Sequence, residues 1–177
     1  MDFDYDPIPL PRQPTLTDEV AAKQAQDYYE SISSRHTVRH FTNQPVPRAT
    51  IETCLRAAGT APSGANHQPW HFVCVSNPEV KRQIREAAEA EERAFYGGKA
   101  GDEWLNDLKK IGTDAHKPFL EEAPWLIAIF LERFGTDDEG NKRKNYYTAN
   151  LLASQPAFFS TPCIKPGLRP LHTHPTR

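Results

Sequence analysis

The sequence has little of what marks a disulfide-rich or metal-binding protein. Only three of its 177 residues are cysteines, and they are far apart and odd in number, which indicates neither a disulfide framework nor a metal-binding spacing. Cys54 and Cys74 lie in apolar surroundings and are predicted to be buried thiols. Cys54 has no paired base, so no catalytic cysteine is expected. The seven histidines form no ligand spacing, so no metal site is expected either.

Several further classes of protein are excluded by what is missing. The formal net charge of −2 argues against a nucleic-acid-binding protein, which is normally basic. No run of about 18 apolar residues occurs, so no segment is predicted to span a membrane. The acidic first residues, Met1–Pro7, lack the basic and apolar regions of a signal peptide. We therefore expect a cytoplasmic location.

Proline is unevenly distributed and divides the chain into three parts. Residues 1–16 contain four prolines, which exclude regular structure and predict an extended arm. Residues 154–177 contain five prolines and are predicted to form an irregular tail. The helical and strand patterns lie between them, in residues 17–153, which we predict to be a partial domain.

Apolar periodicity and capping residues predict the elements of that domain. Two β-rich segments, Trp70–Val75 and Trp125–Leu131, are predicted to be strands, the first of them a buried central strand. Residues 137–140 are predicted to be a turn, and a further helix could begin at Asn145. These patterns favour an α+β fold with a central sheet flanked by helices. Two strands are too few to close such a core, which indicates a fold truncated at its C-terminus. The predicted helices cover about 17–33, 48–58, 77–92 and 102–112.

A polar loop precedes the first predicted strand. Pro62 and Gly64 interrupt regular structure, and the small residues Gly64 and Ala65 would let the backbone approach a ligand closely. Ser63 offers a hydroxyl group, and the three residues after Ala65 offer further donors and acceptors. Taken alone, the loop is equally typical of an ordinary connection between a helix and a strand.

A second polar cluster lies upstream, just after the first predicted helix. Arg35, His36, Thr37 and Arg39 fall within five residues. Two guanidinium groups and a hydroxyl this close together suit a phosphate group, because arginine donates in a bidentate fork. On its own the cluster is more typical of a solvated basic turn. Together with the polar loop, it indicates a site for a phosphate-bearing ligand.

These residues resemble the flavin-dependent nitroreductase family. The pattern Ser34–Phe41 is similar to that family's first FMN motif, and Ala57–Trp70 is similar to its second. Within the family the likeness is greatest to the iodotyrosine deiodinase branch, whose insertion resembles Glu92–Tyr96 and Trp104–Lys110. The resemblance covers roughly residues 27–147 and implies a nitroreductase-like α+β fold with a substrate lid at about 89–118.

The resemblance also implies where the cofactor FMN would bind. Arg35, His36 and Thr37 would hold its phosphate side. Arg39 would lie near the pyrimidine edge of the flavin, where a cation stabilises negative charge on the reduced ring. The flavin-contacting loop residues would be Pro62, Ser63 and Gly64.

The substrate residues implied by the resemblance are Ala65, Glu92, Tyr96 and Lys117. Charge alone is consistent with the last three, since an amino-acid zwitterion needs an anion for its ammonium group and a cation for its carboxylate. Glu92 and Tyr96 are four residues apart and would share a helix face. Without the resemblance, Glu92 and Lys117 would be two ordinary surface charges.

The implied activity is reductive dehalogenation of a halotyrosine-like aromatic substrate, with NAD(P)H as reductant and a homodimer as the assembly. No protein nucleophile is needed, so no catalytic residue is assigned. A general NAD(P)H-dependent nitroreductase or quinone reductase and an inactive truncated fragment are the alternatives. The later part of the family pattern is not matched: Gly167–Pro175 only loosely echoes it, and no role is assigned to Thr173. We therefore expect weak or absent FMN binding by this chain.

Overall fold

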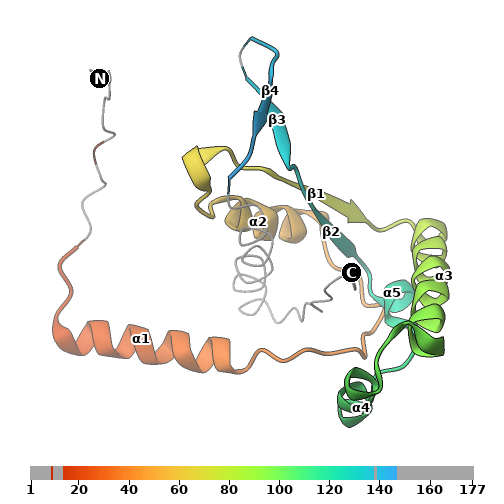
Figure 1. Cartoon of the computed structure of the whole chain (residues 1–177). Helices are drawn as coiled ribbons and strands as arrows, with labels where there is room; N and C mark the ends of the chain where they lie inside the picture. The colour runs from red at the N-terminus through yellow and green to blue at the C-terminus, as the bar shows by residue number, and fades with distance from the viewer. Residues whose placement is uncertain (1–8, 10–13, 138, 147–177) are drawn as a thin grey trace. The chain divides into compact units, whose positions relative to one another are not determined.

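Figure 1 shows the computed structural model, which describes residues 9, 14–137 and 139–146. The chain divides into two compact units between Arg35 and His36. The predictions for the tail and for a helix beginning at Asn145 lie wholly or mainly outside the described residues. The division into 1–16, 17–153 and 154–177 stays a prediction.

The described part of the first unit contains one helix, α1 (Asp18–Ser33), at the predicted position. The Thr17 hydroxyl caps it by accepting from the Val20 backbone N–H at 3.4 Å, and acidic residues occupy its first turn. No residue of α1 is buried. The helix therefore depends on its cap and on exposed side-chain pairs such as Lys23–Asp27, which contribute little individually.

The core of the second unit lies between a helix and a two-stranded sheet. Strand β1 (Trp70–Val75) pairs antiparallel with β2 (Leu126–Leu131), as the strand patterns predict. Helix α2 (Arg48–Gly59) buries Ile51, Cys54 and Ala58, whose spacing places them on one helical face. Phe72 of β1 and Ile127 of β2 pack against Cys54 and Ala58. This small apolar layer holds α2 on the sheet.

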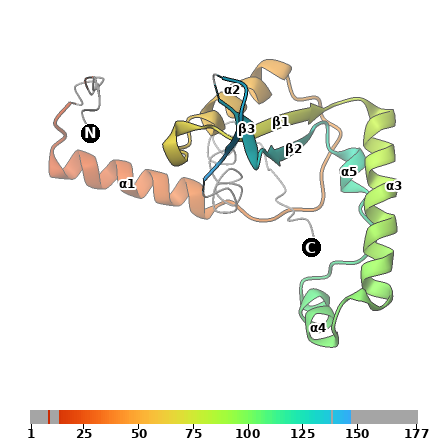
Figure 2. The same cartoon turned by 45° about the horizontal axis from the view of Figure 1, so that its top comes forward.

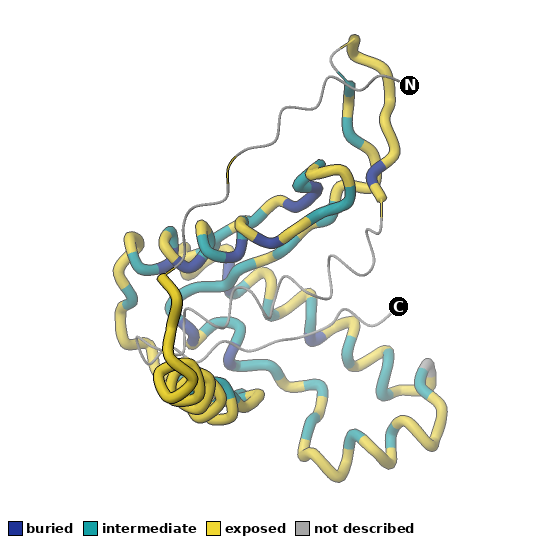
Figure 3. Tube along the Cα trace, turned by 90° about the vertical axis from the view of Figure 1, so that its left-hand side faces the viewer, coloured by how far each residue is buried: buried dark blue, intermediate teal, exposed yellow. Residues whose placement is uncertain are grey.

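The prediction that β1 is a buried central strand was wrong. Trp70 is its one buried residue, whereas Val73 is 45% exposed and Phe130 on β2 is 57% exposed. Successive side chains of a strand point to opposite faces, so Phe72 faces α2 and Val73 points away from it. Cys74 is also half-buried rather than buried, although partial burial still raises the pKa of its thiol. The burial map in Figure 3 shows few buried positions in the trace.

A second hairpin follows β2 and was not predicted as strands. Strands β3 (Phe134–Thr136) and β4 (Lys142–Lys144) pair antiparallel around the predicted turn at 137–140. Asp137 closes the turn, because its side chain accepts from the backbone N–H of Asn141 at 2.7 Å. Each strand has only three residues and β4 is entirely basic, so no apolar alternation reveals them.

The remaining α-helices lie between β1 and β2 in the chain. We call residues 93–116, which contain α4, the α4 excursion. Helix α3 (Pro78–Ala94) begins at the predicted Asn77 cap and leads into η2 (Phe95–Lys99), a π-helical turn. Gly98 has a φ of 136°, a conformation that suits glycine, so the predicted glycine interruption is confirmed. Helix α4 (Asp102–Lys110) lies at the far end of the excursion, and the short α5 (Phe119–Glu122) lies beside α3 (Figures 1 and 2). No helix within the described residues is long and apolar enough to cross a membrane.

A buried lysine joins α3 to the end of α5. The Lys81 ammonium group donates to the backbone carbonyl groups of Glu121 and Ala123, both at 2.8 Å, and the residue is buried. A Lys81→Met variant would keep most of the side-chain volume but leave both carbonyl groups without this donor. We expect the free energy of unfolding to fall by about 1–3 kcal/mol.

Denaturant unfolding followed by circular dichroism would measure this loss. Lys109→Met, which alters an exposed lysine on α4, is the matched control and should change the stability by no more than about 0.5 kcal/mol. Equal effects of the two variants would contradict a structural role for the Lys81 hydrogen bonds.

Candidate functional site

The loop between α2 and β1 has a strained backbone that its own side chains hold in place. Ala65, Asn66 and Gln68 adopt positive φ values of 50°, 54° and 48°. The Ser63 hydroxyl accepts from the Gln68 backbone N–H at 2.9 Å, and the Gln68 side-chain amide donates to Asn66 Oδ1 at 2.9 Å. Such conformations are uncommon outside glycine and persist only where the surroundings enforce them, often at ligand sites.

A buried asparagine connects this loop to the second hairpin. Asn145 is only 3% exposed; its Oδ1 accepts from His67 Nδ1 at 2.9 Å, and its Nδ2 donates to the Glu132 carbonyl at 2.8 Å. Since Oδ1 can only accept, His67 carries its hydrogen on Nδ1 in this arrangement. Sequence reasoning missed Asn145, because a lone asparagine between a basic strand and the tail has no motif to mark it.

The basic cluster lies in a segment without helix or strand, between α1 and α2. Arg35 belongs to the first compact unit, while His36, Thr37 and Arg39 belong to the second. Arg39 is half-buried, and His36 and Thr37 are exposed. Among the residues that the structure describes, no hydrogen bond or ion pair engages the side chains of His36, Thr37 or Arg39. Their predicted convergence with Ser63 and Gly64 on one flavin stays a prediction.

The structure does bring two of the predicted substrate residues together. Glu92, in the last turn of α3, and Lys117, ahead of α5, form an ion pair with 3.2 Å between Oε2 and Nζ. The Lys117 side chain is only 12% exposed and also donates to the Asp114 carbonyl and the Thr113 hydroxyl. Tyr96 lies in η2, half-buried, with its ring edge-on to Phe95. Opposite charges therefore meet in a partly desolvated position where the α4 excursion leaves and returns.

The residues of the loop between α2 and β1 that were predicted to bind ligands differ in accessibility. Pro62 and Ala65 are exposed, while Ser63 and Gly64 are half-buried. No hydrogen bond or ion pair links this loop to Glu92, Tyr96 or Lys117 within the described residues. In the same residues, no group of histidine, cysteine and acidic side chains is arranged to hold a metal ion.

Comparisons with curated proteins extend these observations. The chain is 44% identical over 151 residues to a protein named iodotyrosine deiodinase from Haliscomenobacter hydrossis, covering 85% of this chain and 68% of that protein. It is 40% identical to iodotyrosine deiodinase of Nematostella vectensis, covering 74% and 50%, and 43% identical to iodotyrosine deiodinase 1 of Homo sapiens, covering 71% and 43%. The chain thus spans about two thirds of the first relative and about half or less of the other two.

Solved structures agree on the fold. One is described as oxidised iodotyrosine deiodinase bound to FMN and 3-iodo-L-tyrosine; it matches with a TM-score of 0.73 and 29% identity over 85% of this chain and 76% of that one. A BluB-like flavoprotein from Clostridium difficile matches with a TM-score of 0.55 and 23% identity, over 78% of this chain and 69% of that one, which supports the fold alone. The model of the nitroreductase family matches residues 32–155, so the predicted α+β, nitroreductase-like fold is confirmed and this chain belongs to the nitroreductase family.

Proposed function

We propose that this chain belongs to an FMN-dependent oxidoreductase that removes halogen reductively from halotyrosine-like substrates. The observation that carries the proposal is the ion pair between Glu92 and Lys117 at the base of the α4 excursion. The relatives named iodotyrosine deiodinase, and the solved relative described as bound to FMN and 3-iodo-L-tyrosine, support the same substrate class.

The ion pair suits exchange with an amino-acid zwitterion. A ligand's ammonium group would take the place of Lys117 beside Glu92, and its carboxylate would pair with the displaced Lys117 ammonium group. One internal pair would become two pairs, each with a partly buried protein group, where charge-assisted hydrogen bonds are strong. Tyr96, four residues after Glu92, would add a phenolic hydroxyl as a further donor.

The donor set of the basic cluster fits the phosphate of FMN. Arg35, His36 and Thr37 would bind that group, and Arg39 would lie at the pyrimidine edge of the flavin ring. The side chains of His36, Thr37 and Arg39 have no hydrogen-bond or ion-pair partners among the described residues. FMN would therefore displace no existing contact of these three side chains. Pro62, Ser63 and Gly64 would contact the ring, and Ala65 would face the substrate. When bound, FMN supplies the redox chemistry.

The contributions of the chain itself are binding, orientation and charge. The Arg39 guanidinium group would stabilise negative charge that develops on the pyrimidine edge. Glu92 and Lys117 would hold the substrate at its amino-acid end, which leaves its phenol ring free to stack. Closure of the α4 excursion over the substrate would exclude water. NAD(P)H as reductant, a homodimeric assembly and a cytoplasmic location stay predictions.

The role of Arg39 can be tested through FMN affinity. Arg39→Gln should raise the Kd for FMN about tenfold or more, because a hydrogen bond from a charged group contributes roughly 1.5–3 kcal/mol. Quenching of flavin fluorescence at increasing protein concentration measures the Kd. Arg56→Gln, which alters an exposed arginine on α2, should leave the Kd within about twofold. If the unmodified chain shows no saturable quenching, the inactive-fragment alternative is favoured.

The substrate residues can be tested with the FMN-loaded chain. Glu92→Gln and Lys117→Met should each weaken 3-iodotyrosine binding about tenfold or more, because one charge of the zwitterion loses its partner. A nitroaromatic compound without an amino-acid group should bind as before. Titration of flavin fluorescence measures both affinities, and Glu103→Gln on α4 is the control for an exposed acidic residue. Unaltered 3-iodotyrosine affinity in both variants would favour a general nitroreductase.

A further inference from the structure

A second carboxylate on α3 contacts the same lysine at its backbone. Glu89 is buried and lies three residues before Glu92, on the same side of the helix. Its Oε1 accepts from the Lys117 backbone N–H at 2.9 Å, whereas Glu92 pairs with the ammonium group of that residue. The backbone positions of Glu89 and Glu92 are separated by about 4.5 Å along the helix axis. Lys117 is therefore attached to α3 both through its backbone N–H and through its ammonium group.

The charge of Glu89 is balanced from several sides. Arg85 contacts Glu89 Oε2 at 3.0 Å, His116 Nδ1 lies 3.2 Å from Oε1, and Arg93 lies 3.9 Å from Oε2. The hydrogen bond from the Lys117 N–H is the main cause that lowers the pKa of the Glu89 carboxyl group; burial opposes this effect, and the charges of Arg85 and Arg93 add to it. Glu89 is therefore an anion at neutral pH and a strong acceptor for the Lys117 N–H.

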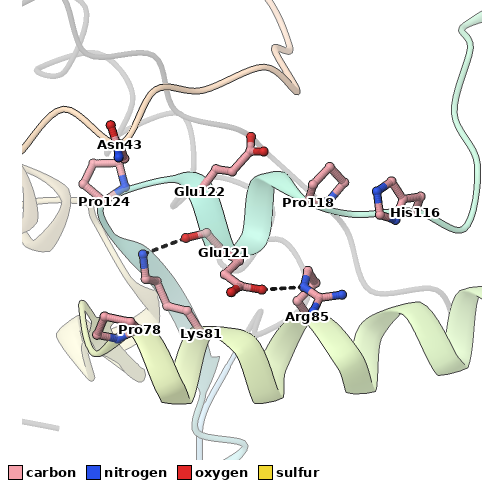
Figure 4. A pocket seen from close by; sticks show the side chains of 9 residues that line it. All are labelled: Asn43, Pro78, Lys81, Arg85, His116, Pro118, Glu121, Glu122 and Pro124. Atoms are coloured by element: carbon pink, nitrogen blue, oxygen red, sulfur yellow. Dashed lines mark hydrogen bonds and ion pairs between the residues drawn. The ribbon is translucent and has the colours of Figure 1, made fainter.

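Helix α5 braces this carboxylate through Arg85. The Nε of Arg85 donates to Glu121 Oε2 at 2.6 Å while its terminal nitrogen contacts Glu89. Figure 4 shows Arg85 and Lys81 reaching from α3 toward Glu121, around a pocket also lined by His116 and Pro118. The chain around Lys117 is thus held against α3 by the hydrogen bond from the Lys117 N–H to Glu89 and by the ion pair between Arg85 and Glu121.

We propose that Glu89 is a positioning residue, which fixes the backbone of Lys117 so that its ammonium group meets the carboxylate of an amino-acid ligand. This inference rests on the proposed function. In the ligand-free chain, Lys117 is held by both Glu89 and Glu92. Once the ligand's ammonium group takes the place beside Glu92, the bond to Glu89 is the attachment to α3 that remains. Glu89 itself would touch neither ligand nor cofactor.

Hydrogen exchange at the Lys117 amide tests the positioning directly, in the complete chain without ligand. Glu89→Ala removes the acceptor, and exchange should become about tenfold faster or more, as expected for loss of a hydrogen bond to a charged group. Glu89→Gln keeps an acceptor oxygen and should restore part of the protection. Glu79→Ala, an exposed acidic residue in the first turn of α3 that contacts neither Glu89 nor Arg85, should leave the Lys117 amide protected. Unchanged exchange in Glu89→Ala would overturn the proposal.

A second measurement separates positioning from a general loss of structure. In the FMN-loaded chain, Glu89→Ala should weaken 3-iodotyrosine binding about tenfold. The affinities for FMN and for a nitroaromatic ligand should stay within about twofold, since neither involves Lys117. A parallel loss of all three affinities would overturn the proposal. If the unmodified chain binds no 3-iodotyrosine, the proposed function fails, while the exchange rate of Lys117 still decides whether Glu89 holds its backbone.

Discussion

The arrangement of the candidate lid, at about residues 89–118, depends on one lysine whose backbone N–H and ammonium group are both bound by carboxylates of a single helix. Glu92 pairs with the Lys117 ammonium group and Glu89 accepts from its backbone N–H, so the segment after α4 is tied to α3. A pair of this kind on an open surface would contribute little, because water screens it. Here Glu89 is buried and the Lys117 side chain is nearly so, which strengthens both contacts and makes an unpaired charge costly. A zwitterionic ligand satisfies that constraint because it brings one charge of each sign.

The loop between α2 and β1 is held by a different kind of interaction. Its three positive-φ residues lie within a network of uncharged hydrogen bonds, in which the Gln68 side chain donates to Ser63 and Asn66 and His67 donates to Asn145. Because Asn145 also donates to the Glu132 carbonyl, it fixes the position of the loop relative to the end of β2. Backbone strain of this kind is retained where a surrounding network enforces it. The loop is thus shaped before any ligand arrives.

Local patterns predicted most of the described helices and both strands of the main sheet, because caps, prolines and glycines mark their ends. Asn77 and Pro78 begin α3 where predicted, whereas Glu92 and Lys117 were singled out only through the family resemblance, which did not predict the ion pair between them. Burial was harder to predict. The apolar run of β1 suggested a buried strand, but the two-stranded sheet leaves Val73 exposed. Asn145 and Glu89 escaped notice for a common reason: their partners lie 78 and 28 residues away along the chain. Periodicity and motif spacing carry no information about such contacts.

The two halves of the candidate site differ in how firmly the chain holds them. The substrate half rests on α3, where charged hydrogen bonds fix Glu89, Lys117 and Arg85. The phosphate half lies in residues 36–47, none of which is buried, and Trp125 anchors the far end of this segment through one hydrogen bond to the Val46 carbonyl. Ordering a loosely held segment opposes binding, since each immobilised side chain costs about 0.5–1.5 kcal/mol. Under the proposed function, FMN binding would therefore have to order Arg39 and its neighbours, whereas Glu89 and Lys117 are already held in place for the amino-acid end of a substrate.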